Sequence, residues 1–172
     1  PEAEWLLQHK NFIQADYLRQ FNEETIEPRN FDHCGEACAV ACKKYLDEFK
    51  KDYEPYAALG PLNGIFDHRA AEQLNKFVDS MGLDSIQAGG TISWIMELIA
   101  RGLLPAADFG LPEYTGKFTF SSDIKSFDLV TDSLANSDYA LKILRMILFS
   151  KKGGPFRKGI RSAAKYLDAK YR

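Results

Sequence analysis

Apolar residues recur at steps of three and four along most of this chain, a spacing typical of amphipathic helices. The clearest example begins after Asp67, a residue type that caps helix N-termini, and ends before Gly82, a residue type that stops helices. The apolar residues between them are Ala71, Leu74, Val78 and Met81. The pattern predicts a helix over about 68–81, with His68 on its surface in the first turn.

Three further helices are predicted downstream, each with its own stop signal. The first follows Gly89-Gly90-Thr91 and ends before Gly102. The second runs from about Ser137 to Leu148, before Lys151-Lys152-Gly153-Gly154-Pro155. The third spans Phe156 to Tyr171 and is weakened by Gly159. Less regular patterns predict helices around 11–21 and 38–50, and only 117–120 alternates as a strand does. The fold class is therefore expected to be all-α.

Composition limits the size and the partners of this fold. A chain of 172 residues that is 45% hydrophobic can form one domain with a core and is short for two, so a single helical domain over 1–172 is expected. The net charge of −2 gives no sign of a nucleic-acid surface. No apolar run approaches the ~20 residues that span a membrane, and the N-terminus does not resemble a signal peptide. The chain opens without Met, so we expect a piece of a longer polypeptide. The cysteine usage described next favours a reducing, cytoplasmic location.

All three cysteines, Cys34, Cys38 and Cys42, fall within nine residues. This clustering is unlike a secreted disulfide framework and is typical of a metal or redox site. Steps of four advance about 400° on a helix, so a turn near Gly35 is needed for the three sulfur atoms to converge. Thiolates suit a soft metal, and an iron–sulfur cube usually takes four of them. The alternatives are three buried structural thiols or a zinc site completed by His33.

Three further segments are candidates for binding or catalysis. Asp79 lies in the last turn of its predicted helix, where the helix dipole disfavours a negative charge, so its carboxylate is a candidate for binding something outside the helix. Gly89-Gly90-Thr91 is expected to open the next helix, where free N–H groups would suit a phosphate. In Tyr53-Glu54-Pro55-Tyr56, Glu54 would suit proton transfer if it lies in a pocket, and otherwise it is a loop carboxylate.

Taken in order, these segments resemble the aldehyde:ferredoxin oxidoreductases, which are tungsten or molybdenum bis-pyranopterin enzymes. The resemblance covers nearly the whole chain, and its most specific element is Asp79-Ser-Met-Gly82-Leu83-Asp84. The other elements are the cysteine cluster, Tyr53-Glu54-Pro55-Tyr56 with Leu59-Gly60-Pro61, Thr91–Glu97 with Gly102-Leu103, and Tyr139–Leu167.

The resemblance implies a role for each motif. Cys34, Cys38 and Cys42 would be three ligands of a [4Fe–4S] cluster, and Asp79, Gly82, Leu83 and Asp84 would contact one pterin of the tungsten cofactor. Glu54 would donate or accept a proton while an aldehyde is oxidised to the carboxylate. Electrons would pass from the metal through the pterin and the cluster to ferredoxin.

The sequence departs from the family pattern at several points. The usual cysteine spacing is C-x2-C-x3-C, whereas this chain has C-x3-C-x3-C. This sequence lacks the second pterin motif, which carries the fourth cysteine, and the E-x-x-H motif of a bridging metal. It also lacks the N-terminal pterin-binding β domain and the C-terminal helical domain. The absence of E-x-x-H favours the branches without the bridging metal. Among these, Cys34-Gly-Glu-Ala-Cys38 with Lys43-Lys44 resembles the glyceraldehyde-3-phosphate ferredoxin oxidoreductase branch. The isolated chain is expected to be inactive without the remaining domains of the parent enzyme.

Two other functions are compatible with the same residues. The chain would in one case be a non-catalytic helical domain that holds an iron–sulfur or zinc site for a partner protein. In the other case it would be a metal-free interaction domain from a degenerate relative, in which Glu54 has no role.

Overall fold

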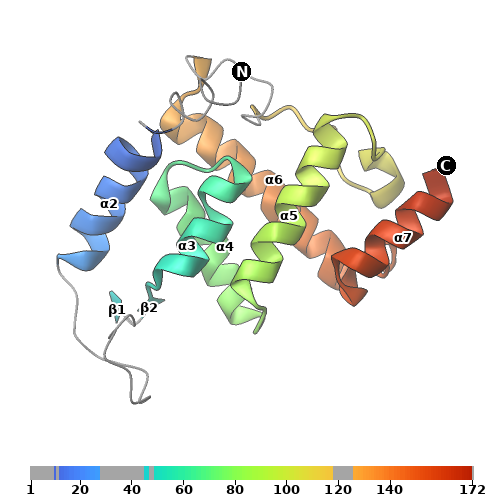
Figure 1. Ribbon diagram of the computed structural model, residues 1–172, viewed down its shortest axis with the longest axis horizontal. Helices are drawn as coiled ribbons and strands as arrows, with labels where there is room; N and C mark the ends of the chain where they lie inside the picture. The colour runs from blue at the N-terminus through green and yellow to red at the C-terminus, as the bar shows by residue number, and fades with distance from the viewer. Residues whose placement is uncertain (1–9, 11, 28–44, 47–48, 118–125, 172) are drawn as a thin grey trace.

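The computed structural model describes residues 10, 12–27, 45–46, 49–117 and 126–171, and these form a bundle of helices (Figure 1). Cys34, Cys38 and Cys42 lie outside the described residues, as do residues 118–120 of the possible strand. In chain order the elements are η1 (Phe12–Leu18), α2 (Arg19–Phe21), η2 (Asn22–Ile26), β1 (Tyr45–Leu46), β2 (Phe49–Lys50), α3 (Tyr53–Leu59), η3 (Pro61–Asn63), α4 (His68–Ser80), α5 (Ser85–Ala100), η4 (Ala106–Phe109), α6 (Leu129–Phe149), η6 (Lys151–Gly153), η7 (Phe156–Lys158) and α7 (Ile160–Tyr171).

The all-α prediction is confirmed. The one departure within the described residues is at the end of the helix expected over 38–50. There Tyr45–Leu46 pairs with Phe49–Lys50 in a two-residue antiparallel ladder. No helix within the described ranges is both long and apolar enough to cross a membrane.

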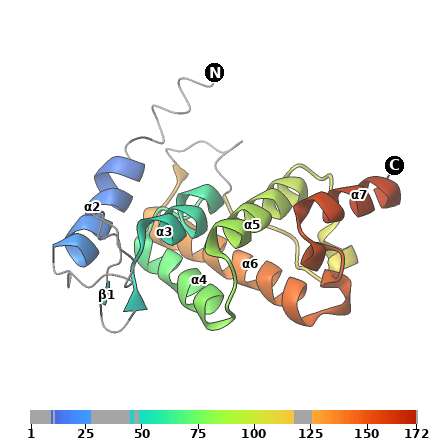
Figure 2. The same ribbon diagram turned by 60° about the horizontal axis from the view of Figure 1, so that its bottom comes forward.

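The core lies where α3, α4, α5 and α6 meet, and the N-terminal helical segment packs beside it (Figures 1 and 2). The largest hydrophobic side chains that are fully buried there are Tyr56, Leu59, Ile65, Phe66, Leu74, Val78, Ile92, Ile95, Met96 and Ile143. From the N-terminal segment, the Tyr17 hydroxyl donates a hydrogen bond of 2.5 Å to the carbonyl of Tyr56. The Phe21 ring lies 5.5 Å from the Tyr56 ring, measured between centroids. This contact fixes the N-terminal segment against α3.

Helix α6 begins at Leu129, eight residues before the predicted start, because Asp128 caps it through a 2.7 Å bond from the Thr131 N–H. Its first half was missed because three of its inward-facing residues are polar: Ser133, Asn136 and Ser137. Ser133 Oγ accepts from the N–H groups of Phe66 and Asp67, at 2.9 and 3.0 Å. Asn136 Nδ2 and Ser137 Oγ donate to the carbonyls of Gly64 and Ala70, each at 2.8 Å. These bonds tie the loop before α4 to α6.

The start of α5 differs from the prediction. The helix begins at Ser85, where the Asp84 carboxylate accepts from the Gln87 N–H at 2.7 Å. Gly89 and Gly90 therefore lie inside the helix, and their N–H groups are not available to a phosphate. Gly89 instead allows α5 to approach α3. A Cβ at this position would lie 2.3 Å from the Ala58 carbonyl oxygen, whereas a Cβ at Gly90 would meet nothing within 4 Å.

This contrast predicts opposite effects for two neighbouring substitutions. Gly89→Ala should lower the free energy of unfolding by about 1–3 kcal/mol, because the added methyl group forces α3 and α5 apart. Gly90→Ala should raise it by about 0.4–1 kcal/mol, because alanine loses less backbone entropy on folding. Urea unfolding followed by circular dichroism measures both. Equal midpoints for the two variants would contradict the close approach of the helices.

Candidate functional site: a polar hollow between α3, α4 and α5

The Asp79-Ser-Met-Gly82-Leu83-Asp84 motif forms the connection between α4 and α5. The Gly82 N–H donates to the Asp79 carbonyl at 3.0 Å and the Leu83 N–H to the Val78 carbonyl at 3.1 Å. Gly82 has a positive φ of 64°, so these bonds form the Schellman motif that commonly ends helices. Asp84 then caps α5. Local folding thus accounts for Gly82, Leu83 and Asp84.

Asp79 is the motif residue whose side chain has no such local role. Among the described residues, no hydrogen bond or ion pair reaches its exposed carboxylate. It lines a hollow of about 210 Å³ between the start of α3, the end of α4 and the start of α5. The remaining lining residues are Asp52, Pro55, Tyr56, Asn75, Lys76, Leu83 and Ser85. The structure therefore brings the Tyr53-Glu54-Pro55-Tyr56 segment and the Asp79 motif together.

Glu54 does not line this hollow. It lies exposed in the first turn of α3, a helix rather than the loop that the sequence allowed. A carboxylate at this position interacts favourably with the helix dipole, so α3 itself gives a structural reason for the acid.

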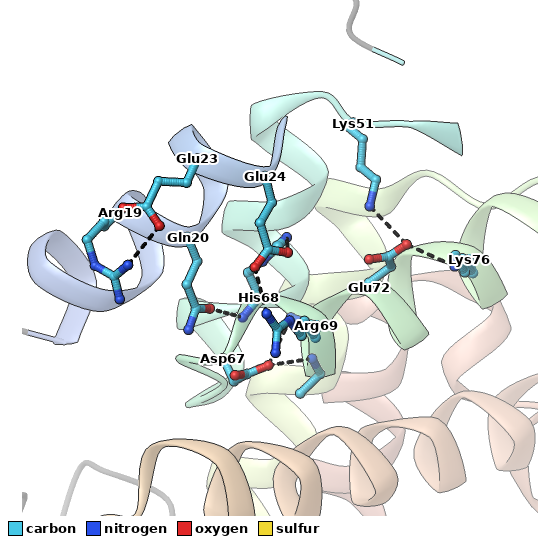
Figure 3. A network of polar contacts seen from close by, with 11 residues as sticks. Arg19, Gln20, Glu23, Glu24, Lys51, Asp67, His68, Arg69, Glu72 and Lys76 are labelled. Carbon is cyan, nitrogen blue, oxygen red and sulfur yellow. Dashed lines mark hydrogen bonds and ion pairs between the residues drawn. The ribbon is translucent and has the colours of Figure 1, made fainter. Parts of the chain in front are cut away.

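A chain of ion pairs runs beside the hollow and reaches its lining at Lys76 (Figure 3). The Glu72 carboxylate bridges Lys51 and Lys76, with both N–O distances at 2.9 Å. Burial alone would raise the pKa of Glu72, but the ammonium groups of Lys76 and Lys51 outweigh burial and lower it. Lys51 is 2% exposed, and its ammonium lies 5.3 Å from the centroid of the Tyr56 ring. The bridge therefore holds the start of α3 against α4 and orients Lys76 at the hollow.

His68 belongs to a second group of polar contacts, around Glu24, and its expected surface position was wrong. It is 1% exposed. Its backbone N–H donates to Gln20 Oε1 at 3.0 Å, and its imidazole Nε2 lies 3.5 Å from Glu24 Oε2 (Figure 3). The Tyr56 ring lies 5.9 Å from the imidazole, between centroids. Burial lowers the pKa of His68, and the Glu24 carboxylate opposes this shift more weakly. The N-terminal segment thus covers the start of α4.

No sequence pattern pointed to Lys51, Asn75 or Lys76 as residues of a site. A lysine can be predicted to be buried only when its acidic partner is known. The partner of Lys51 is Glu72, which lies 21 residues further along the chain, so no local pattern joins them. Met96 of α5 lies in the core, and the partly buried Trp94 packs against it.

Comparison with known proteins identifies the family. The model for "Aldehyde ferredoxin oxidoreductase, domains 2 & 3" matches residues 3–170. This chain belongs to that family. The predicted resemblance is therefore confirmed.

Relatives within this family include a protein from the predicted branch. Glyceraldehyde-3-phosphate:ferredoxin oxidoreductase of Pyrococcus furiosus is 35% identical over the whole chain and 26% of its own length. An uncharacterized protein of Methanocaldococcus jannaschii is 34% identical over 91% of the chain and 25% of its own length. A tungsten-containing aldehyde ferredoxin oxidoreductase of Pyrococcus horikoshii is 38% identical over 43% of the chain and 13% of its own length.

The chain spans about a quarter of the length of the first two relatives. No solved structure matches it significantly.

The buried His68 predicts how stability depends on pH. Its folded-state pKa lies below the ordinary value of 6.5, so the unfolded chain binds a proton that the folded chain does not. The free energy of unfolding should therefore fall as the pH drops below about 6.5. His68→Gln should flatten this fall between pH 7 and 5.5, as measured by urea unfolding at each pH. An unchanged pH dependence in this variant would show that another group is responsible.

Proposed function

We propose that this chain supplies part of the active centre of an enzyme that oxidises an aldehyde to the carboxylate and passes the electrons to ferredoxin. The family match over residues 3–170 carries the proposal. The hollow supports it, because the two motifs that resemble the family's cofactor and catalytic segments lie next to one another there. The aldehyde, ferredoxin and the other domains of the parent enzyme would be its partners.

The residues of the hollow fit one edge of a pterin. A pterin is a flat heteroaromatic ring with N–H donors and with nitrogen and oxygen acceptors. Tyr56, Pro55 and Leu83 provide apolar surface, while Asp79 provides an acceptor and Lys76 and Ser85 provide donors. A tungsten or molybdenum bis-pyranopterin, when bound, would supply the two-electron chemistry. Asp79 would hold the pterin by accepting from its N–H groups, and Gly82 and Asp84 would fix the turn that presents Asp79.

The cysteines would complete the route for electrons. Cys34, Cys38 and Cys42 are proposed as three thiolate ligands of a [4Fe–4S] cluster. Thiolates suit such a cluster because they are soft ligands. A non-catalytic domain that binds a cluster or zinc for another protein would have the same ligands. Such a domain would not explain the Asp79 carboxylate in the hollow.

Glu54 is proposed as the group that moves a proton during aldehyde oxidation. Its carboxylate is exposed in the first turn of α3, so a substrate or water can reach it. In this role the carboxylate would exchange a proton with the reacting aldehyde or with water beside it.

Metal content tests the cofactor proposal. The protein at its full natural length, purified without oxygen, should contain tungsten or molybdenum together with about four iron atoms per chain. Asp79→Ala should lower the tungsten or molybdenum content, because the pterin loses a hydrogen-bond acceptor, while the iron content stays unchanged. Gln73→Ala, on an exposed part of α4 outside the hollow, is the control. Zinc alone, or no metal, in the unaltered protein would contradict the enzyme and favour a non-catalytic domain.

Turnover tests Glu54 separately. In the full-length protein, Glu54→Gln should reduce aldehyde oxidation by about 10²-fold or more with unchanged metal content, because the amide cannot exchange the proton. Glu113→Gln, which alters an exposed acid in the loop after α5, should leave turnover unchanged. Unaltered turnover in Glu54→Gln would remove Glu54 from the mechanism.

A further inference from the structure

Tyr56 of α3 is one of the largest fully buried side chains, and it is also part of the lining of the hollow. Only 2% of the residue is exposed. The centroids of the Phe21 and His68 rings lie 5.5 and 5.9 Å from the centroid of its own ring, and the Lys51 ammonium lies 5.3 Å from it. Its main-chain carbonyl accepts from the Tyr17 hydroxyl. These contacts fix the direction of the Tyr56 side chain.

The hydroxyl at the tip of this ring has no hydrogen-bond partner within the described part of the chain. It is also not one of the polar atoms that the surrounding residues seal from solvent without a partner, as they seal Asn63 Oδ1 and His68 Nδ1. The hollow that Tyr56 lines accounts for this opening. Because the hydroxyl of a buried tyrosine usually finds a partner, its state here indicates that the partner is a group bound in the hollow.

The Tyr56 hydroxyl acts as a donor. Burial raises the pKa of Tyr56, and the nearby Glu72 carboxylate raises it further, so the hydroxyl keeps its proton. The Asp79 carboxylate in the same hollow supplies an acceptor. The hollow therefore presents a donor on a rigid ring together with an acceptor.

We propose that the Tyr56 hydroxyl donates to the ring carbonyl of the bound pterin, while the Asp79 carboxylate accepts from the N–H groups beside that carbonyl. This inference rests on the proposed function, and it makes Tyr56 a cofactor-binding residue as well as a source of apolar surface. One edge of a pterin carries a carbonyl next to a ring N–H and an amino group. A fixed donor and a carboxylate are together complementary to this order of groups.

Other ligand groups fit this donor and this acceptor less well. A phosphate or a carboxylate would accept from Tyr56, but Asp52 and Asp79 in the same hollow would repel it. A ring with N–H donors and no acceptor would satisfy Asp79 and leave the Tyr56 hydroxyl without a partner. A neutral ring whose carbonyl lies next to its N–H groups satisfies both residues.

The variant Tyr56→Phe tests the inference, because it removes the hydroxyl and keeps the ring. In the full-length protein purified without oxygen, pterin and tungsten or molybdenum should be lost during dialysis about tenfold faster than from the unaltered protein, because the carbonyl loses its donor. Iron content should stay unchanged. In protein prepared without tungsten and molybdenum, the midpoint of urea unfolding should not fall, because the hydroxyl has no partner in the described part of the chain.

Tyr139→Phe is the matched control. The Tyr139 hydroxyl donates to the Pro112 carbonyl at 2.9 Å, and Tyr139 does not line the hollow. This variant should lower the urea midpoint of the cofactor-free protein, because the Pro112 carbonyl loses its donor. The rate at which the cofactor is lost should not change. The two variants therefore separate cofactor binding from folding.

Two results would overturn the inference alone. One is equal retention of pterin by Tyr56→Phe and by the unaltered protein. The other is a fall in the urea midpoint of cofactor-free Tyr56→Phe as large as that of Tyr139→Phe, which would give the hydroxyl a role in folding. In both cases the unaltered protein still contains pterin with tungsten or molybdenum, so the proposed function stands. An unaltered protein without them would overturn the proposed function and this inference with it.

Discussion

Three polar side chains on the buried side of α6 determine where the rest of the described structure lies. Ser133, Asn136 and Ser137 are each 0% exposed and hydrogen-bond to the backbone of the segment from Gly64 to Ala70. A buried backbone group without a partner costs about 1–3 kcal/mol, so this segment cannot shift along α6 without loss. The segment contains the N-cap of α4. The start of α4 therefore has one position, and the position of Asp79 at its other end follows from the length of the helix.

Folding explains three residues of the motif that joins α4 and α5, but it does not explain the Asp79 carboxylate. Gly82, Leu83 and Asp84 stop one helix and start the next, and these roles would exist in a protein with no cofactor. The Asp79 carboxylate has no such role, and in the last turn of α4 the helix dipole disfavours it. Asp79 is therefore the residue of this motif for which we propose a ligand.

The sequence predicted those features that depend on neighbours along the chain. The Asp67 cap, the glycine stop at Gly82 and the apolar face of α5 are all local patterns, and each is present. The features it missed depend on distant segments. His68 is buried because Gln20 and Glu24 cover it, and the first half of α6 was overlooked because its buried residues are polar. Of the residues that line the hollow, the sequence analysis singled out Asp79 and Leu83 but not Asn75 or Lys76, because a hollow exists only once three helices meet.

The charges around the hollow indicate which part of a ligand it can hold. The ammonium of Lys76 is already paired with Glu72, and Glu72 is shared with Lys51, so these three residues together carry one positive charge. The carboxylates of Asp52 and Asp79 lie in the same hollow and outweigh it. A bare phosphate would therefore be repelled, even though a helix begins beside it. A neutral ring that offers N–H donors to Asp79 and apolar surface to Tyr56 would not be repelled, and this is the end of a pterin that carries no phosphate.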